Sequence, residues 1–143
     1  MRLWEVMSMI EAYIGFGDRC YTVSIDGHAG YAPKGQDIVC AGVSALASAF
    51  LEALITLMNS DYADGVLVET GDGLFKLAIR GIKDEQTNDI VKTLVIMLDR
   101  GLGLIERQYP DYISLYSFDF PERDNDNDTS EQTMNKNREE VRG

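Results

Sequence analysis

The sequence predicts an α/β fold of the α+β kind, a two-layer domain built from a largely antiparallel sheet and two main helices. Three observations support this prediction. Short segments alternate between apolar and polar residues, as half-buried strands do. Two longer segments repeat apolar residues at helical spacing, and short glycine-containing turns separate neighbouring strands. In chain order the predicted elements follow as ββαββαβ.

The first two strands are predicted to form a hairpin. One strand lies within residues 7–15, and the other covers residues 20–26, where apolar and polar residues alternate. A turn at residues 16–18 joins them. The second strand ends at Gly27 and His28, where the chain changes direction and a side chain can face an open cleft.

The first helix is predicted from residue 38 to residue 58, with Asp37 as its N-cap. Residues 30–36, which precede it, hold glycine and proline without periodicity, so we expect a mobile loop. The helix is long enough to span a membrane. However, Glu52 and the interleaved small residues favour a helix that is buried between the sheet and a partner, and we expect no membrane association.

A second hairpin, a second helix and a last strand complete the fold. Residues 65–70 and 74–80 flank the turn at residues 71–73, which reads Gly-Asp-Gly. The second helix opens near Asp84 and runs towards residue 109, where a proline follows. Residues 112–118 then alternate well enough for a final strand.

Length and charge set limits on the kind of protein. The 143 residues suit one domain, expected over residues 1–120, followed by an acidic and polar disordered tail over residues 121–143. The net charge of −11 argues against direct nucleic-acid binding, because neutralising phosphates requires clustered lysines and arginines. Such a charge could draw a basic partner or only confer solubility, and solubility is the favoured reading.

The cysteine and histidine content excludes further classes. Two cysteines, Cys20 and Cys40, do not make a disulfide framework, and the single histidine excludes zinc-type pairing. We therefore expect no metal, no cofactor and a reducing, cytoplasmic location. The first residues do not resemble a signal peptide, since glutamates interrupt the apolar run.

The most informative stretch brings His28 close in sequence to Cys40, which lies at the start of the predicted helix. A thiol in the first helical turn faces unpaired N–H groups and the positive end of the helix dipole, both of which favour the thiolate. A nearby imidazole can accept its proton. This pattern predicts a nucleophile and a base. The residue types alone also allow a structural reading, with a small buried cysteine and a histidine in a turn.

The segment Gly27-His28-Ala29, followed by Gly-Gln-Asp-Ile-Val-Cys-Ala at residues 35–41, strongly resembles the bacterial ribosomal-processing cysteine protease (Prp) family. The resemblance covers roughly residues 10–116. It implies that Cys40 is the nucleophile and His28 the general base and later general acid. The supporting positions that it implies are Gly27, Asp37 and Ser44.

The family resemblance also implies a substrate and an assembly. Its members remove a short N-terminal extension from one large-subunit ribosomal protein, cutting after a hydrophobic sequence that contains phenylalanine. The resemblance further implies a homodimer in the bacterial cytoplasm. Nothing in composition or spacing shows that substrate. The dimer has some support in the sequence, because the nearly all-apolar first helix has more hydrophobic surface than one sheet face must cover.

The roles of two supporting residues stay open from the sequence. Asp37 could orient His28 or could only cap its own helix. Capping is favoured, and as an anion near Cys40 this residue would oppose thiolate formation. Ser44 lies one turn beyond Cys40 on the same helix face, where it could donate a hydrogen bond within the site or simply allow close packing.

Two other functions remain open at this point. A noncatalytic dimeric module that binds or assembles a basic ribosomal protein would suit the acidic charge and the small-residue helix face. A protease of the same kind, retargeted to a phage or mobile-element structural protein, would suit the terminal segments that lie outside the resemblance. The substitution Cys40→Ser separates binding from catalysis.

Overall fold

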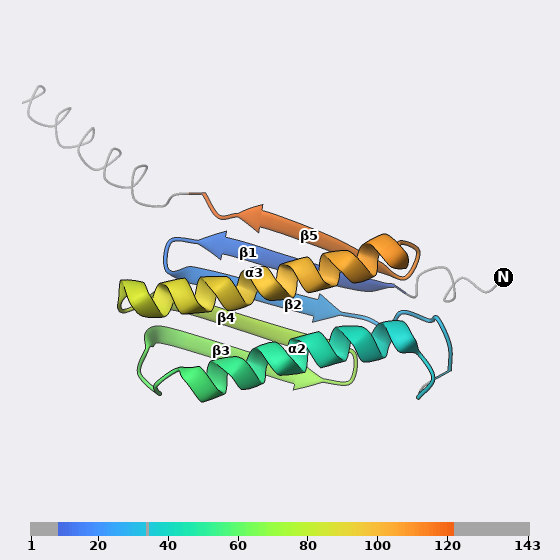
Figure 1. Cartoon of the computed structure of the whole chain (residues 1–143), viewed down its shortest axis with the longest axis horizontal. Helices are drawn as coiled ribbons and strands as arrows, with labels where there is room; N and C mark the ends of the chain where they lie inside the picture. The colour runs from blue at the N-terminus through green and yellow to red at the C-terminus, as the bar shows by residue number, and fades with distance from the viewer. Residues whose placement is uncertain (1–8, 34, 122–143) are drawn as a thin grey trace, which may run out of the picture.

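The computed structural model describes residues 9–33 and 35–121, which form one sheet and two helices (Figure 1). The elements in chain order are β1 (Ile10–Gly17), β2 (Cys20–Asp26), α2 (Ile38–Leu57), β3 (Ala63–Gly71), β4 (Leu74–Ile82), α3 (Glu85–Gln108) and β5 (Ile113–Asp119). The predicted α+β class and the order ββαββαβ are confirmed. The predicted tail covers residues 121–143, of which residues 122–143 lie outside the described part of the chain.

The sheet has the strand order β3-β4-β2-β1-β5. All neighbouring strands are antiparallel except β1 and β5, which are parallel. The prediction of a largely antiparallel sheet is therefore confirmed. The first hairpin extends further than the sequence indicated, since β1 continues to Gly17 and the turn falls at residues 18–19.

Both helices lie on the same face of the sheet, with α2 towards β3 and α3 towards β1 (Figure 1). The core fills the space between the two layers, and the residues that bury the largest side chains completely include Ile14, Tyr21, Phe50, Ile79, Leu98 and Leu102. Strand residues of the core alternate with exposed ones, which is the period of two expected for a sheet covered on one face. The Tyr21 hydroxyl donates a hydrogen bond of 2.8 Å to Asn88 Oδ1, which ties β2 to α3.

The two helices approach each other closely at glycine residues. A side chain at Gly101 of α3 would place its Cβ 2.9 Å from Leu46 Cδ1 of α2, and one at Gly42 would lie 3.3 Å from Ile105 Cδ1. Glycine lowers helix propensity by about 1 kcal/mol relative to alanine. These two glycines therefore provide the space that the opposing leucine and isoleucine side chains occupy.

Helix α2 is apolar on most of its surface. It is the one helix of the described residues that is long and apolar enough to cross a membrane by length and composition. Its inner side packs on the sheet and α3, with Val39, Val43, Ala47, Phe50 and Leu54 buried. Its outer side leaves Ile38, Ile55 and Leu57 exposed. The buried side matches the expectation that this helix packs against the sheet. The exposed side is where we expected a partner from the sequence.

Candidate active site

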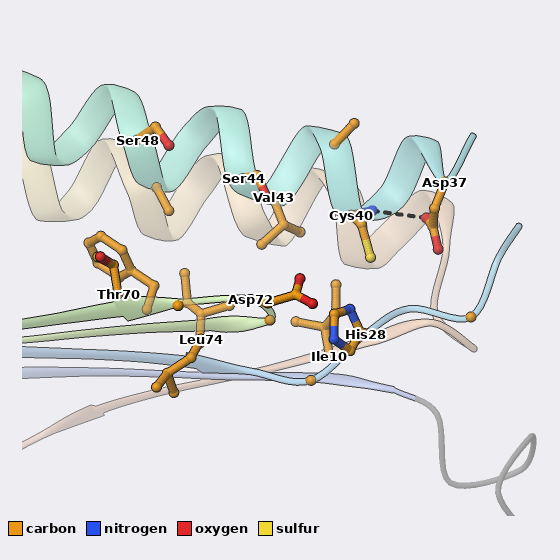
Figure 2. Close-up of a pocket in the computed structure, with 18 of the residues that line it drawn as sticks. Ile10, His28, Asp37, Cys40, Val43, Ser44, Ser48, Thr70, Asp72 and Leu74 are labelled. Carbon is orange, nitrogen blue, oxygen red and sulfur yellow. Dashed lines mark hydrogen bonds between the residues drawn. The ribbon is translucent and has the colours of Figure 1, made fainter. Parts of the chain in front are cut away.

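All five residues that the sequence singled out line one cavity of about 690 Å³ between α2 and the adjoining ends of the sheet strands (Figure 2). These residues are Gly27, His28, Asp37, Cys40 and Ser44. The cavity also takes in the turn between β3 and β4 and apolar side chains of the neighbouring strands. The fold thus brings the segment after β2, the start of α2 and the β3–β4 turn to one cavity.

Cys40 is the third residue of α2 and follows the N-cap Asp37, as predicted. Its Sγ accepts a hydrogen bond of 3.3 Å from the buried backbone N–H of Ala29. The segment that carries His28 is therefore joined to the sulfur through the main chain. Cys40 is a partly buried free thiol that faces the cavity (Figure 2).

His28 is held in place by glycines on two sides. The Gly27 N–H donates a hydrogen bond of 2.9 Å to the carbonyl of Gly73. Gly27 has a φ of 106°, and a Cβ there would collide with the Met9 carbonyl oxygen. A Cβ at Gly73 would lie 2.6 Å from His28 Nε2. The imidazole therefore lies directly against the β3–β4 turn.

Asp37 caps the helix, which is the role that the sequence favoured. Its Oδ1 accepts a hydrogen bond of 2.9 Å from the Cys40 N–H, and its Oδ2 accepts one of 3.0 Å from the Tyr31 N–H. Partial burial acts to raise the pKa of this carboxyl group, but the backbone donors outweigh it and leave the pKa below its ordinary value. Both carboxylate oxygens are used by backbone groups.

The expectation of a stabilised thiolate at Cys40 is wrong for the protein without substrate. Burial raises the pKa of the Cys40 thiol, and the negative charges of Asp37 and Asp72 raise it further. The Ala29 N–H acts in the opposite direction but is outweighed. The physical reason is first the burial of the sulfur, and second the capping carboxylate, which takes the Cys40 N–H and places its charge beside the sulfur. The resting site thus favours a neutral thiol.

The loop between His28 and Cys40 is anchored by one aromatic side chain, that of Tyr31. The Tyr31 ring packs edge-on against Tyr109 and Tyr112, with centroid distances of 5.6 and 5.1 Å. The Gln36 N–H also donates to the Pro33 carbonyl at 2.9 Å. The sequence did not connect the loop with these tyrosines, and the mobility that we expected for it stays a prediction.

Sequence reasoning missed the β3–β4 turn as part of the site. Asp72 and Gly73 line the cavity, and Figure 2 shows the Asp72 carboxylate pointing towards His28 and Cys40. The turn itself was recognised from the sequence. Only the pairing of β2 with β4, which sets Asp26 opposite Leu74, places it beside His28. The turn could have been assigned to the site only if the strand order of the sheet had been known.

Ser44 lines the same cavity one turn beyond Cys40, and both readings of its role stay open. Within residues 9–33 and 35–121, no group of three histidine, cysteine, aspartate or glutamate side chains could hold a metal ion.

The packing of His28 on Gly73 generates a first prediction. Gly73→Ala should displace the imidazole, because a Cβ at this position would lie 2.6 Å from Nε2. The φ of 67° should add about 1 kcal/mol of backbone strain. Since the chain has a single histidine, its imidazole proton resonances in the NMR spectrum report this displacement without overlap.

Gly71→Ala is the matched control for that substitution. Its nearest neighbour would be Leu74 Cβ at 3.9 Å, so the imidazole resonances should stay in place. Equal shifts in both variants would show that His28 does not depend on the turn.

The position of Asp37 generates a second prediction. Asp37→Ala, made in a Cys20→Ser background, should lower the apparent pKa of the Cys40 thiol, because a negative charge leaves its surroundings. The midpoint of iodoacetamide alkylation against pH measures this. The lost cap should also lower the free energy of unfolding by about 1 kcal/mol at neutral pH. The loss should shrink in acid, because a carboxyl group with a lowered folded-state pKa stabilises above its ordinary pKa and loses that effect as it becomes protonated.

Asp37→Asn is the control, because asparagine caps helices as well as aspartate does but carries no charge. It should lower the Cys40 pKa as alanine does, with a smaller loss of stability. An unchanged alkylation midpoint in both variants would contradict the assigned effect of the charge.

Comparison with known proteins places this geometry in a family. The sequence model described as cysteine protease Prp matches residues 9–114. A ribosomal processing protease Prp from S. aureus, in complex with a covalently linked product peptide, has a TM-score of 0.61 and 29% identity over 76% of this chain and 99% of that chain. The S. aureus protease with a substrate peptide has a TM-score of 0.58 and 29% identity over the same shares, 76% and 99%.

A protein from Streptococcus mutans shares the fold at 24% identity, with a TM-score of 0.60 over 80% of this chain and 97% of that chain. No curated protein matches the chain. The family match covers most of the sequence, including the motif of residues 27–44 that lines the cavity. The chain therefore belongs to the Prp family of cysteine proteases.

Proposed function

We propose that this protease cleaves peptide bonds by acyl transfer, with Cys40 as nucleophile and His28 as base. The observation that carries the proposal is the meeting of residues 27–29 and 37–44 at one cavity, with the Ala29 N–H bonded to Cys40 Sγ. Membership in the Prp family supports the same assignment.

The chemistry runs in two stages. His28 accepts the proton of the Cys40 thiol as the sulfur attacks the scissile carbonyl carbon, and a thioester forms when the C–N bond breaks. The same imidazole gives its proton to the leaving amine. It then removes a proton from water, which attacks the thioester and releases the acid. The raised pKa of the thiol makes this base necessary, because little thiolate is present beforehand.

The oxyanion formed in each stage needs hydrogen-bond donors. The Cys40 N–H already bonds Asp37 Oδ1, so the first turn of α2 offers fewer donors than the sequence indicated. In the loop the Tyr31 and Gln36 N–H groups are likewise used, by Asp37 and Pro33. The donors that the loop offers at the cavity are therefore the N–H groups of Gly30 and Gly35. We assign the oxyanion site to these loop groups. Gly27 supports His28, and Ser44 lines the cavity in which the peptide would bind.

The substrate that we infer is a large-subunit ribosomal protein with a short N-terminal extension. Cleavage follows a hydrophobic sequence that contains phenylalanine. The S. aureus relative, a ribosomal processing protease, holds a substrate peptide in one structure and a product peptide in another. The cavity here includes apolar side chains that suit such a sequence, namely Ile10, Ile25, Val43, Leu74 and Phe75. A net charge of −11 complements a basic ribosomal protein, and the reaction takes place in the bacterial cytoplasm.

Cleavage of the extended ribosomal protein from the same genome tests this function. The full chain should release the extension, and mass spectrometry of both products locates the cut. Cys40→Ser should bind the substrate but lose turnover, whereas Cys20→Ser should cleave normally. If the full chain binds without cleaving and Cys40→Ser binds equally well, the chain is a binding module. Cleavage of only a phage structural protein would instead identify a retargeted protease.

We further propose that the protein is a homodimer joined through the β3 side of the sheet. Strand β3 is an edge strand, and its Val66, Leu67 and Val68 are 41, 74 and 46% exposed. Three consecutive exposed apolar residues on an unpaired edge form a surface that pairs readily with another strand. The outer side of α2 adds exposed apolar residues at the same margin (Figure 1).

Sedimentation velocity at micromolar concentration tests the dimer. The full chain should sediment as a dimer, and Leu67→Lys should shift it to monomer because a charge on the edge opposes strand pairing. Leu104→Lys is the matched control, since it adds the same charge at an exposed leucine of α3. A full chain that stays monomeric would contradict the proposal.

A further inference from the structure

We propose that Asp72 is a positioning residue of the site, whose carboxylate holds the His28 imidazole towards the Cys40 sulfur and stabilises the imidazolium formed during the reaction. This inference rests on the proposed function of His28 and Cys40. It adds a third group to that pair from a part of the chain outside the family motif.

The first support is the placement of the turn that carries Asp72. This turn joins β3 to β4, and its Gly73 carbonyl accepts a hydrogen bond of 2.9 Å from the Gly27 N–H. The residue before His28 is therefore tied to the residue after Asp72. The separation of 2.6 Å between a Cβ at Gly73 and His28 Nε2 shows how closely the imidazole lies on the turn. Figure 2 shows the Asp72 carboxylate pointing towards His28 and Cys40.

The second support comes from the ionisable groups that surround the cavity. They are His28 after β2, Asp37 and Cys40 at the start of α2, and Asp72 between β3 and β4. Asp37 uses one carboxylate oxygen on the Cys40 N–H and the other on the Tyr31 N–H. Asp72 is thus the other carboxylate among the described lining residues, and Figure 2 shows it reaching towards His28 from the β3–β4 turn.

The negative charge of Asp72 has two opposing effects on the reaction, one on the His28 imidazolium and one on the Cys40 thiol. A carboxylate beside a catalytic imidazole fixes its orientation and stabilises the imidazolium that forms when the proton arrives. The same negative charge raises the pKa of the Cys40 thiol. Removing the charge should therefore make the thiol more acidic while it makes catalysis slower. A residue that only supports the fold would not produce this combination.

Asp72→Asn in the full chain with Cys20→Ser tests the inference. Asparagine is a common turn residue, so the hairpin should still form. We expect kcat to fall by about 10- to 100-fold, the range seen when the outer partner of a metal-bound histidine is removed. KM should stay nearly constant, and the midpoint of Cys40 alkylation should move to lower pH. Asp72→Glu, which restores the charge, should recover part of kcat and the original midpoint.

Glu69→Gln is the matched control. It removes a carboxylate from the same hairpin, but Glu69 is exposed and does not line the cavity, so neither kcat nor the midpoint should change. If Asp72→Asn raises KM at constant kcat, Asp72 binds a basic substrate side chain and the inference is wrong. A lower kcat with an unmoved midpoint, or no change at all, also overturns it. Failure of the proposed function is recognised separately, because the unsubstituted chain would then not cleave at all, or Cys40→Ser would still cleave.

Discussion

The antiparallel pairing of β2 with β4 is the constraint on which the site depends. Its register sets Asp26 opposite Leu74, so the end of β2 lies beside the turn that joins β3 to β4. The Gly27 N–H can then reach the Gly73 carbonyl, and the His28 imidazole lies against that turn. A register shift of one residue would reverse the faces of β2 and bury its polar side chains. The buried Tyr21, Val23 and Ile25 therefore hold the histidine in place from within the core.

Asp37 shows how one side chain links stability to reactivity. As the N-cap it satisfies the Cys40 N–H, and through its second oxygen it holds the start of the loop at Tyr31. The same charge raises the pKa of the thiol that it positions. The helix start favours an anion through its dipole, but a carboxylate already occupies the donor nearest to the sulfur. In the mechanism that we propose, activation of the thiol therefore falls to His28.

Helix α2 has two apolar sides, one that is buried in the core and one that is exposed. One side packs on the sheet and α3 where glycines allow close approach, and it buries Val43 and Phe50. The other side carries alanine, serine and exposed isoleucine at the margin shared with β3. Periodicity alone did not separate these sides, because nearly every position is apolar or small. Packing against the neighbouring elements decides which side is buried.

The sequence by itself determined the order of the elements, the Asp37 cap, the place of Cys40 in the first helical turn and the turn at residues 71–73. These features depend on periodicity and on hydrogen bonds between residues a few positions apart, which a linear pattern contains. Only the tertiary structure decided that Asp72 and Gly73 lie beside His28 and that Tyr31 packs between Tyr109 and Tyr112. It also decided the direction of the Cys40 pKa. That pKa reflects first the burial of the sulfur, which no local pattern records. It also reflects the charge of Asp37, which is near in sequence, and the charge of Asp72, which only the fold brings close.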